Sequence, residues 1–194
     1  MRRLTALCAT LTAACLAFLA ACSSTPRTQY LTLVPPAART ESGSANAVGP
    51  ALLTVTIPSQ VDQPQLAVRH SDGSMALLET ERWIAPLSDE IRNALALDLA
   101  RQWAGNTTNG ARVAVDVQRF DSVPGQYALI DAVWTVSTTA SAAQKISCRS
   151  SIRIAVSEGY PALAKGHQAA LEQLAAQIAK QAFSLRTGGA TCAP

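Results

Sequence analysis

The chain has 194 residues, of which 48% are hydrophobic and 15% are charged. This composition predicts one compact domain and excludes a disordered polyelectrolyte, whose sequence would be polar and highly charged. Sixteen Lys and Arg residues against thirteen Asp and Glu residues give a net charge of +3. Nucleic-acid-binding proteins carry a far denser basic surface, so we expect no nucleic-acid partner.

Residues 1–21 have the organisation of a secretory signal peptide. Arg2 and Arg3 precede an uncharged stretch, 4–21, that is rich in Leu and Ala and ends in small residues. The alternative is a transmembrane anchor, because this stretch lies at the short limit of a membrane-spanning helix. Removal of the segment takes away two arginines and no acidic residue, so the mature chain would carry a net charge of +1.

The end of this segment, Leu19-Ala20-Ala21-Cys22, resembles the lipobox of bacterial lipoproteins. The resemblance implies cleavage between Ala21 and Cys22, with Cys22 as a triacylated N-terminus, and this number of chains is enough for stable anchoring. An Asp directly after the lipidated Cys resembles a signal for retention in the inner membrane. This chain has Ser23 at that position. We therefore expect a lipid-anchored protein at the outer membrane of a Gram-negative bacterium, facing the periplasm.

Two cysteines remain for the folded domain. Of the five in the sequence, two leave with the signal peptide and one would carry lipid, which leaves Cys148 and Cys192. In an oxidising compartment such a pair predicts a disulfide. The open alternatives are two buried thiols or half of a metal site. A metal is not expected, because neither His70 nor His167 has ligand spacing to a cysteine.

The first part of the mature chain is predicted to form strands. Alternating residues predict short strands at 30–34 and 52–57, and the intervening 35–50 predicts a flexible loop that has Pro near both ends. The runs 66–70 and 75–79 flank an Asp-Gly turn, which predicts a β-hairpin.

A helix is predicted from Pro86 to Trp103. Proline suits the first helical turn, and acidic residues follow it where the helix dipole is positive. Apolar residues then recur at every fourth position. Three alternating strands follow, and an apolar stripe predicts a second helix over 160–185. The strands are 112–120, 127–138 and 146–156.

This order predicts a two-layer α+β fold. We expect a mostly antiparallel or mixed sheet of about five or six strands, with both helices, about 86–103 and 160–185, on one face. Three parts are predicted along the chain. These are the signal peptide (1–21), the lipidated N-terminus with the first strand and loop (22–50), and the rest of a single periplasmic domain (51–194).

Catalysis has weak support in the sequence. Asp116, Asp121 and Asp131 lie on or beside neighbouring strands, and paired carboxylates can act as acid and base. They are more simply interpreted as solvent-face residues, and a Gly-x-Ser-x-Gly nucleophile motif is absent from the sequence. We expect a protein that is not an enzyme and has no catalytic, cofactor-binding or metal-binding residues.

Aromatic and basic residues offer a second set of candidates. Trp83 and Trp134 could stack on a ligand, but we expect them to be core residues. Arg69, Arg82 and Arg92 could bind a lipid phosphate or an acidic partner, and the simpler interpretation is that they are solvated.

Three segments in order carry a family resemblance. The first contains Pro58, Asp62 and Pro64-Gln65 and continues to Arg69; the second is the Trp83-Ile84-Ala85-Pro86-Leu87 entrance to a helix. The third contains the strand 113–120 and Trp134, and an Ala-rich helix follows. With the lipobox, these segments resemble PqiC-type lipoproteins, the auxiliary lipoprotein components of ABC-type transport and MCE lipid-transport systems.

The resemblance implies a non-enzymatic partner of an MCE-domain protein and of inner-membrane ABC transporter components, in a system that moves phospholipid. It also implies a homo-oligomer, and we expect exposed sheet edges and the loop 58–65 to assemble a ring. The candidate interaction residues are Pro58, Asp62, Pro64, Gln65 and Arg69. The alternative function is a structural or polysaccharide-export lipoprotein that forms a ring without handling lipid.

Overall fold

The structure is a computed structural model that describes residues 27–36, 50, 52–103, 111–138, 144–189 and 191–192. The predicted signal peptide, the lipidation site at Cys22 and most of the predicted loop 35–50 lie outside these residues. The described elements, in chain order, are β1 (Gln29–Leu31), β2 (Leu52–Thr56), β3 (Gln65–Arg69), β4 (Met75–Trp83), α2 (Leu87–Gln102), β5 (Arg112–Val123), β6 (Tyr127–Ser137), β7 (Lys145–Ala155) and α3 (Tyr160–Arg186).

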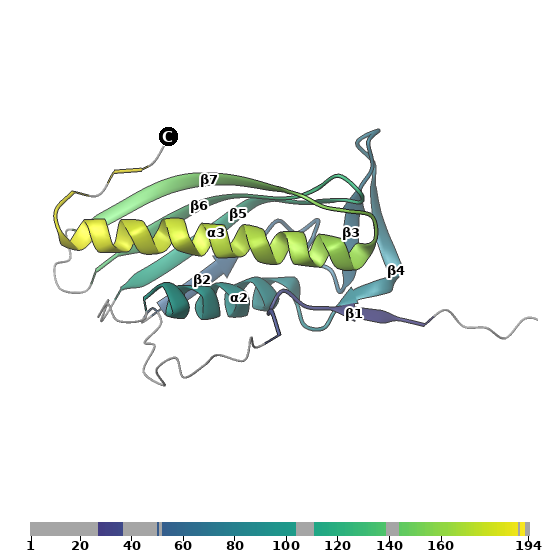
Figure 1. Cartoon of the computed structure of the whole chain (residues 1–194), viewed down its shortest axis with the longest axis horizontal. Coiled ribbons are helices and arrows are strands. Elements are labelled where there is room, and N and C mark those ends of the chain that lie inside the picture. The colour runs from purple at the N-terminus through teal and green to yellow at the C-terminus, as the bar shows by residue number, and fades with distance from the viewer. Residues whose placement is uncertain are drawn as a thin grey trace, which may run out of the picture.

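The strands form two mixed sheets, which confirms the predicted α+β class (Figure 1). One sheet has the order β1-β4-β3 and the other has the order β2-β5-β6-β7. The pairs β1–β4 and β2–β5 are parallel, and the remaining pairs are antiparallel. The described part has seven strands in two sheets, whereas one sheet of about five or six strands was predicted. The strands divide because the β3–β4 hairpin pairs with β1 and packs against β5 instead of extending the larger sheet.

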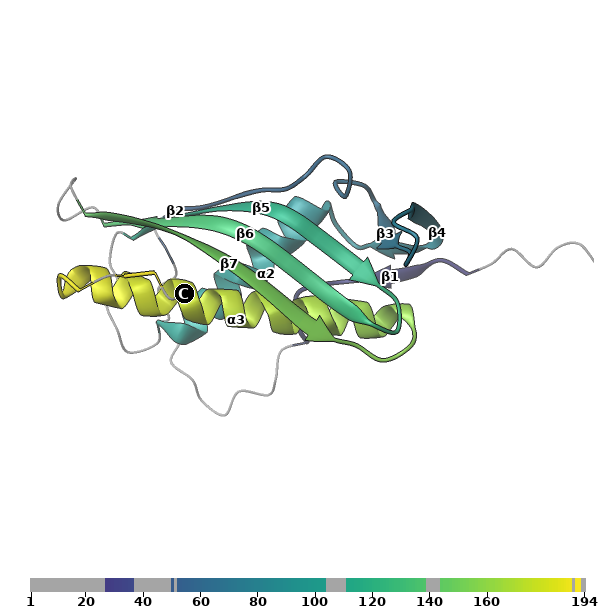
Figure 2. The ribbon, with the colours of Figure 1, turned by 90° about the horizontal axis from the view of Figure 1, so that it is seen from above.

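Both helices cover one face of the four-stranded sheet, as predicted (Figure 2). α3 packs along β6 and β7, and α2 lies beside α3 and against β2. Buried and exposed side chains alternate along the first part of β5, which explains this arrangement. Val113, Val115 and Val117 are buried beneath the helices, and the residues between them are exposed on the other face. The other face of the sheet carries polar side chains.

The predicted helix at 86–103 is confirmed as α2. Its apolar stripe, Leu87, Ile91, Leu95 and Leu99, is fully buried. Glu90 in the first turn is also buried, and its carboxylate accepts hydrogen bonds from the Leu33 backbone N–H and the Thr32 hydroxyl, each at 2.7 Å. These bonds explain why β1 ends at Leu31 and not at the predicted residue 34, because the chain turns there to meet α2.

The second helix is confirmed as α3, and it lies very close to the sheet at Gly166. A Cβ atom at this position would lie 2.9 Å from the Cβ of Ala128 on β6, so glycine is needed for the close approach. Trp83 and Trp134 are 4% and 2% exposed, which confirms them as core residues. Within the described part of the chain, no helix is long and apolar enough to cross a membrane.

Candidate functional site

The predicted interaction loop lies beside a surface groove at the junction of β4 and α2. The loop turns tightly, because the Val61 N–H donates to the Pro58 carbonyl at 3.1 Å, and Val61 is buried while Asp62 is exposed. The Trp83 N–H donates to the Pro64 carbonyl at 2.9 Å, which holds the loop against the end of β4. The groove has a volume of about 400 Å³ and is lined by Asp62, Gln63, Pro64, Trp83, Ile84, Ala85 and Pro86.

This groove combines exposed apolar and acidic groups on a rigid frame. Ile84 is 60% exposed, although its N–H is fixed by the Leu31 carbonyl at 2.9 Å. Asp62 supplies one carboxylate at the rim. The exposed apolar side chain on an ordered backbone, together with the neighbouring carboxylate, makes this groove the candidate docking surface.

The five predicted interaction residues do not form one cluster. Pro58, Asp62, Pro64 and Gln65 lie in the loop or at its junction with β3. Arg69 is at the other end of β3, where its Nε lies 3.1 Å from Oδ1 of Asp121 on β5. The structure therefore separates Arg69 from the groove and gives it a structural partner.

Asp121 is a buried carboxylate held between two arginines, and the expectation that it faces solvent is wrong. It is 2% exposed, and it also accepts a hydrogen bond from Arg119. Asp131 is buried in the same way beneath Arg149, which donates to it with two nitrogens. Both aspartates lie on the outer sheet face as predicted, but long arginine side chains cover them.

Asp116 remains on the surface, as predicted. Its carboxylate accepts hydrogen bonds from Thr56 at 2.8 Å and from Gln118 at 2.6 Å. Each of the three aspartates is therefore occupied by its own hydrogen bonds to neighbouring side chains. They do not form a pair of carboxylates for acid–base chemistry.

His167 and Ser122 form a hydrogen-bonded pair in the protein core. The Nε2 atom of His167 lies 2.8 Å from the Ser122 hydroxyl, and the imidazole stacks on Phe120 with ring centroids 3.8 Å apart. His167 is fully buried, and burial lowers its pKa to about 3. The imidazole is therefore neutral at pH 7, and the pair has a structural role because solvent does not reach it.

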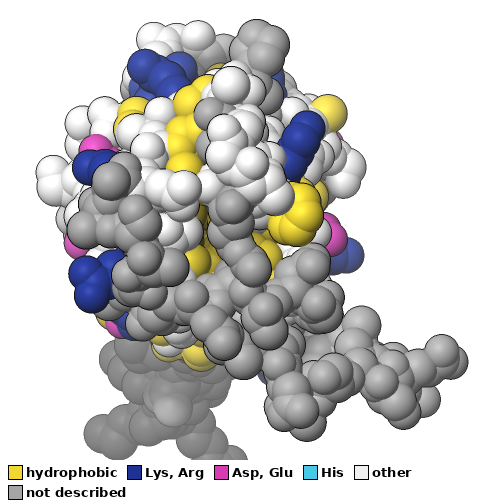
Figure 3. Space-filling model, turned by 90° about the vertical axis from the view of Figure 1, so that its left-hand side faces the viewer, with side chains coloured by type: hydrophobic (Ala, Val, Ile, Leu, Met, Phe, Trp, Pro, Cys, Tyr) yellow, Lys and Arg dark blue, Asp and Glu magenta, His cyan; other side chains and the backbone are white. Residues whose placement is uncertain are grey.

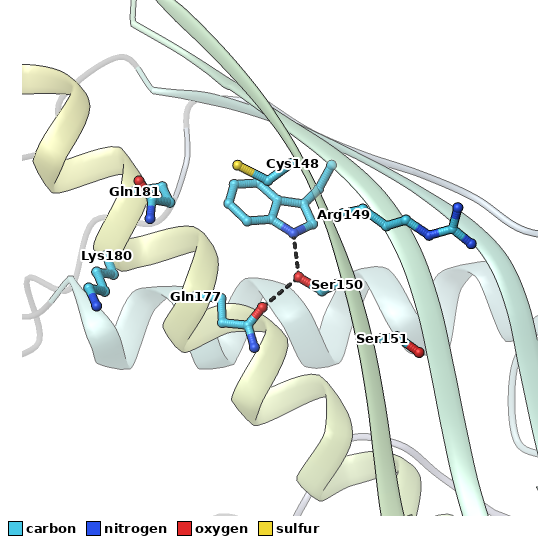
Figure 4. Close-up of a pocket in the computed structure, with 8 residues that line it drawn as sticks. Cys148, Arg149, Ser150, Ser151, Gln177, Lys180 and Gln181 are labelled. Atoms are coloured by element: carbon cyan, nitrogen blue, oxygen red, sulfur yellow. Dashed lines mark hydrogen bonds between the residues drawn. The ribbon is translucent and has the colours of Figure 1, made fainter. Parts of the chain in front are cut away.

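A second hollow lies between β7 and α3 (Figure 4). It has a volume of about 430 Å³. Ser150 on β7 accepts a hydrogen bond from the Trp134 indole at 2.8 Å and donates to Gln177 on α3. Gln181 also lines this hollow; it is 6% exposed, and its Oε1 has no hydrogen-bond partner among the described residues.

The C-terminal tail is joined to β7 next to this hollow. Cys148 and Cys192 form a disulfide in the structure, with Cα atoms 5.5 Å apart. Cys148 is buried and also lines the hollow. Whether the bond forms in the cell stays a prediction.

Comparison with known families identifies the chain. A family model described as ABC-type transport auxiliary lipoprotein component matches residues 30–179. The chain belongs to this family. The match runs from β1 through most of α3 and includes the groove, and it agrees with the resemblance found in the sequence.

Solved structures show the same fold for this auxiliary lipoprotein. A crystal structure of an uncharacterized protein has a TM-score of 0.65 at 18% identity and covers 79% of this chain and 97% of its own. A Xanthomonas campestris protein of the DUF330 family has a TM-score of 0.57 at 19% identity and covers 83% of this chain and 97% of its own. At these identities the likeness shows the fold alone. No curated protein matches the chain.

The sequence missed the hollow between β7 and α3. Ser150 is separated from Gln177 by the end of β7, the connecting turn and the first half of α3, so sequence patterns alone do not bring the two residues together. The available signal was the pair Gln177 and Gln181, which lie one turn apart on α3. Among the described residues, no group of His, Cys, Asp and Glu side chains is arranged to hold a metal ion.

Proposed function

We propose that this auxiliary lipoprotein is anchored in the outer membrane and faces the periplasm, where it serves an ABC-type system that moves phospholipid between membranes. Its role is to bind an MCE-domain protein that connects it to the inner-membrane transporter, and it is not an enzyme. The observation that carries the proposal is family membership over residues 30–179. That family description names transport and a lipoprotein.

The anchor in this proposal is the lipidated Cys22. Three acyl chains on this residue would be enough to tether the domain stably to a membrane. The single periplasmic domain would then comprise residues 51–194 together with the short strand β1.

The docking surface in this proposal is the groove between the loop 58–65 and the start of α2. Ile84 provides an exposed apolar anchor, and Asp62 provides a charge that can select the partner. Backbone hydrogen bonds from Trp83 and Ile84 hold both sides of the groove in place before the partner arrives. Such preorganisation reduces the entropy lost on binding.

Homo-oligomerisation is a further part of the proposal. A ring requires contacts between two different surfaces of each copy, and the mature net charge of +1 keeps the repulsion between copies low. Light scattering on the purified lipoprotein in detergent would measure the number of copies.

The test compares two charge reversals, one in the loop before the β3–β4 hairpin and one at the tip of that hairpin. Asp62→Lys changes the groove, whereas Asp72→Lys makes the same change at the hairpin tip, at the opposite end of β4 from Trp83. Each variant lipoprotein is used to capture a purified MCE-domain protein from the same bacterium, and circular dichroism confirms folding.

We expect Asp62→Lys to weaken capture by about tenfold, as for a charge at an interface, and Asp72→Lys to leave it unchanged. Equal capture by both variants would exclude the groove as the docking surface. Failure of the unchanged protein to capture the MCE-domain protein would contradict the proposed function and favour a ring-forming structural role.

A further inference from the structure

β7 is an edge strand whose outer side is open beyond Cys148, where the C-terminal tail is attached and the Cys192 sulfur lies 3.2 Å from the Ser147 carbonyl oxygen. It pairs only with β6, and within the described residues no strand lies beyond it (Figure 1). Its sequence, KISCRSSIRIA, contains no Pro or Gly, and it runs for 11 residues without a register shift. A long regular edge of this kind is a template for another strand.

The hydrogen bonds between β6 and β7 show which backbone groups of β7 face the open side. The Val156 N–H donates to the Gln126 carbonyl, and the Gln144 carbonyl accepts from the Thr138 N–H, so even-numbered residues bond toward β6. Because these bonds alternate along an antiparallel strand, odd-numbered residues direct N–H and C=O outward. The three central ones are Arg149, Ser151 and Arg153.

The side chains around this edge are mostly basic. Arg149 is paired with Asp131, and Arg153 lies over an aromatic ring of β6, with its guanidinium carbon 3.6 Å from the ring centroid. Glu172, the one acidic residue in the α3 sequence, lines a different hollow together with residues of α2 and so does not offset this charge. At the end of the molecule where β7 begins, Lys and Arg surface is more extensive than Asp and Glu surface (Figure 3). The basic residues beside the edge are Lys145, Arg149, Arg153 and Lys180.

The hollow between β7 and α3 adds a second, independent indication of a ligand. A strand added to β7 would place alternate side chains on the helix-facing side, where the hollow of about 430 Å³ lies. Gln181, whose Oε1 has no hydrogen-bond partner among the described residues, and Lys180 both line this hollow (Figure 4). Arg149 and Ser151 extend to the opposite side of the strand, as the alternation requires.

We propose that the open edge of β7, from Arg149 to Ala155, binds an extended acidic segment of a partner protein, which adds a fifth strand to the sheet. This inference takes one premise from the proposed function, namely that the chain binds a protein partner. Outward N–H and C=O groups alternate along the edge, so a peptide backbone satisfies both kinds, whereas a phosphate group only accepts.

A second copy of this chain is a poorer occupant. The other strands at sheet edges are β1 (QYL), β2 (LLTVT) and β3 (QLAVR), and none of them contains an acidic residue. A neighbouring copy would therefore not supply negative charge opposite Arg153 and Lys180. The charge favours a different chain with alternating acidic side chains.

The experiment uses the full-length lipoprotein in detergent and two synthetic peptides of about ten residues, the length of a long strand. One peptide alternates Thr with Glu, and the other alternates Thr with Lys. Binding is measured by fluorescence anisotropy, and backbone protection is measured by hydrogen exchange. Ser151→Pro removes one outward N–H and leaves the β6–β7 ladder intact, while Ser151→Ala is the matched control that keeps the N–H.

We expect the Thr-Glu peptide to protect the amides of Ser151 and Arg153 and to bind about tenfold more tightly than the Thr-Lys peptide. Ser151→Pro should weaken binding about tenfold, and Ser151→Ala should change it less than about twofold. Arg153→Glu, which leaves the backbone unchanged, should weaken binding to a similar extent.

Three results would overturn the inference. They are equal binding by the Pro and Ala variants, protection confined to other elements, and protection of the edge that grows with protein concentration in the absence of peptide. The last result would assign the edge to a second copy. The groove test with Asp62→Lys is independent, so failure of MCE capture with retained peptide protection would contradict only the proposed function.

Discussion

The Nε of Arg69 lies 3.1 Å from Oδ1 of Asp121, and this ion pair joins the three-stranded sheet to the four-stranded sheet. The carboxylate is buried, whereas the Arg69 side chain is 31% exposed. If the carboxylate is lost, water can still solvate Arg69 and Arg119. The bond between β3 and β5, which belong to different sheets, is lost.

We expect Asp121→Asn to lower the free energy of unfolding by about 1–3 kcal/mol, the range for a charged hydrogen bond in a partly buried setting. Asp116→Asn is the control, since this exposed residue should change the free energy by about 0.5 kcal/mol or less. Urea denaturation monitored by circular dichroism measures both. Similar changes in the free energy of unfolding for the two variants would show that the ion pair between the sheets does not stabilise the fold.

The buried His167 predicts a loss of stability in acid. Its folded pKa of about 3 lies below the ordinary value of 6.5, so the unfolded chain binds a proton that the folded chain does not. The stability contribution is complete above pH 6.5 and is lost as pH falls toward 3, by about 1.4 kcal/mol per pH unit.

The matched variant for this prediction is His167→Gln, which keeps a polar partner for Ser122 without an imidazole. Urea denaturation of both proteins at several pH values between about 7.5 and about 4, which bracket the ordinary histidine pKa, gives the comparison. The difference in unfolding free energy should shrink as pH falls. A constant difference over this range would mean that His167 becomes protonated without unfolding.

The disulfide should stabilise the domain mainly by restricting the unfolded chain. The loop between Cys148 and Cys192 spans 44 positions, for which the chain-entropy model gives about 4 kcal/mol. The double variant Cys148→Ser, Cys192→Ser should lose most of this free energy of unfolding. Mass spectrometry after alkylation under denaturing, non-reducing conditions tests the bond directly, and two alkylated cysteines in protein taken from the periplasm would disprove it.

Lipidation at Cys22 predicts the behaviour of a single variant. Cys22→Ser should accumulate as an unprocessed precursor, because cleavage depends on the modified cysteine, and labelled palmitate should no longer be incorporated. Cys192→Ser, which leaves the lipobox intact, is the control for processing. Release of a soluble, cleaved Cys22→Ser protein would show an ordinary signal peptide instead.

The sequence predicted local elements well because their patterns are local. The stripe at Leu87, Ile91, Leu95 and Leu99 defines α2, and alternating residues define β5 to β7. The division into two sheets was missed, because the partner of β4 is β1 and the pairing of Leu31 with Trp83 joins segments far apart in the sequence. The burial of Asp121 was missed for the same reason: its partner Arg69 lies 52 residues earlier.

The candidate site was predicted in part. The loop near Asp62 and the segment Trp83-Ile84-Ala85-Pro86 were selected separately, and the structure brings them together in one groove. Arg69 was grouped with them as the end of the same family-like segment, but a strand of five residues separates it from the loop. Distance along an extended strand grows by about 3.3 Å per residue, so nearness in sequence does not give nearness in space.

If Cys22 carries the proposed lipid, the position of β1 determines which end of the domain lies near the bilayer. Gln29 follows Cys22 by seven residues, which reach at most about 25 Å when extended. A lipidated Cys22 would hold this end, with Trp83 and the groove beside it, close to the headgroups. α3 begins nearby, since Gln168 donates to the Thr32 carbonyl at 2.9 Å, and its 27 residues extend about 40 Å. The groove and the start of β7 would therefore stand at different heights in the periplasm, and one elongated partner could contact both.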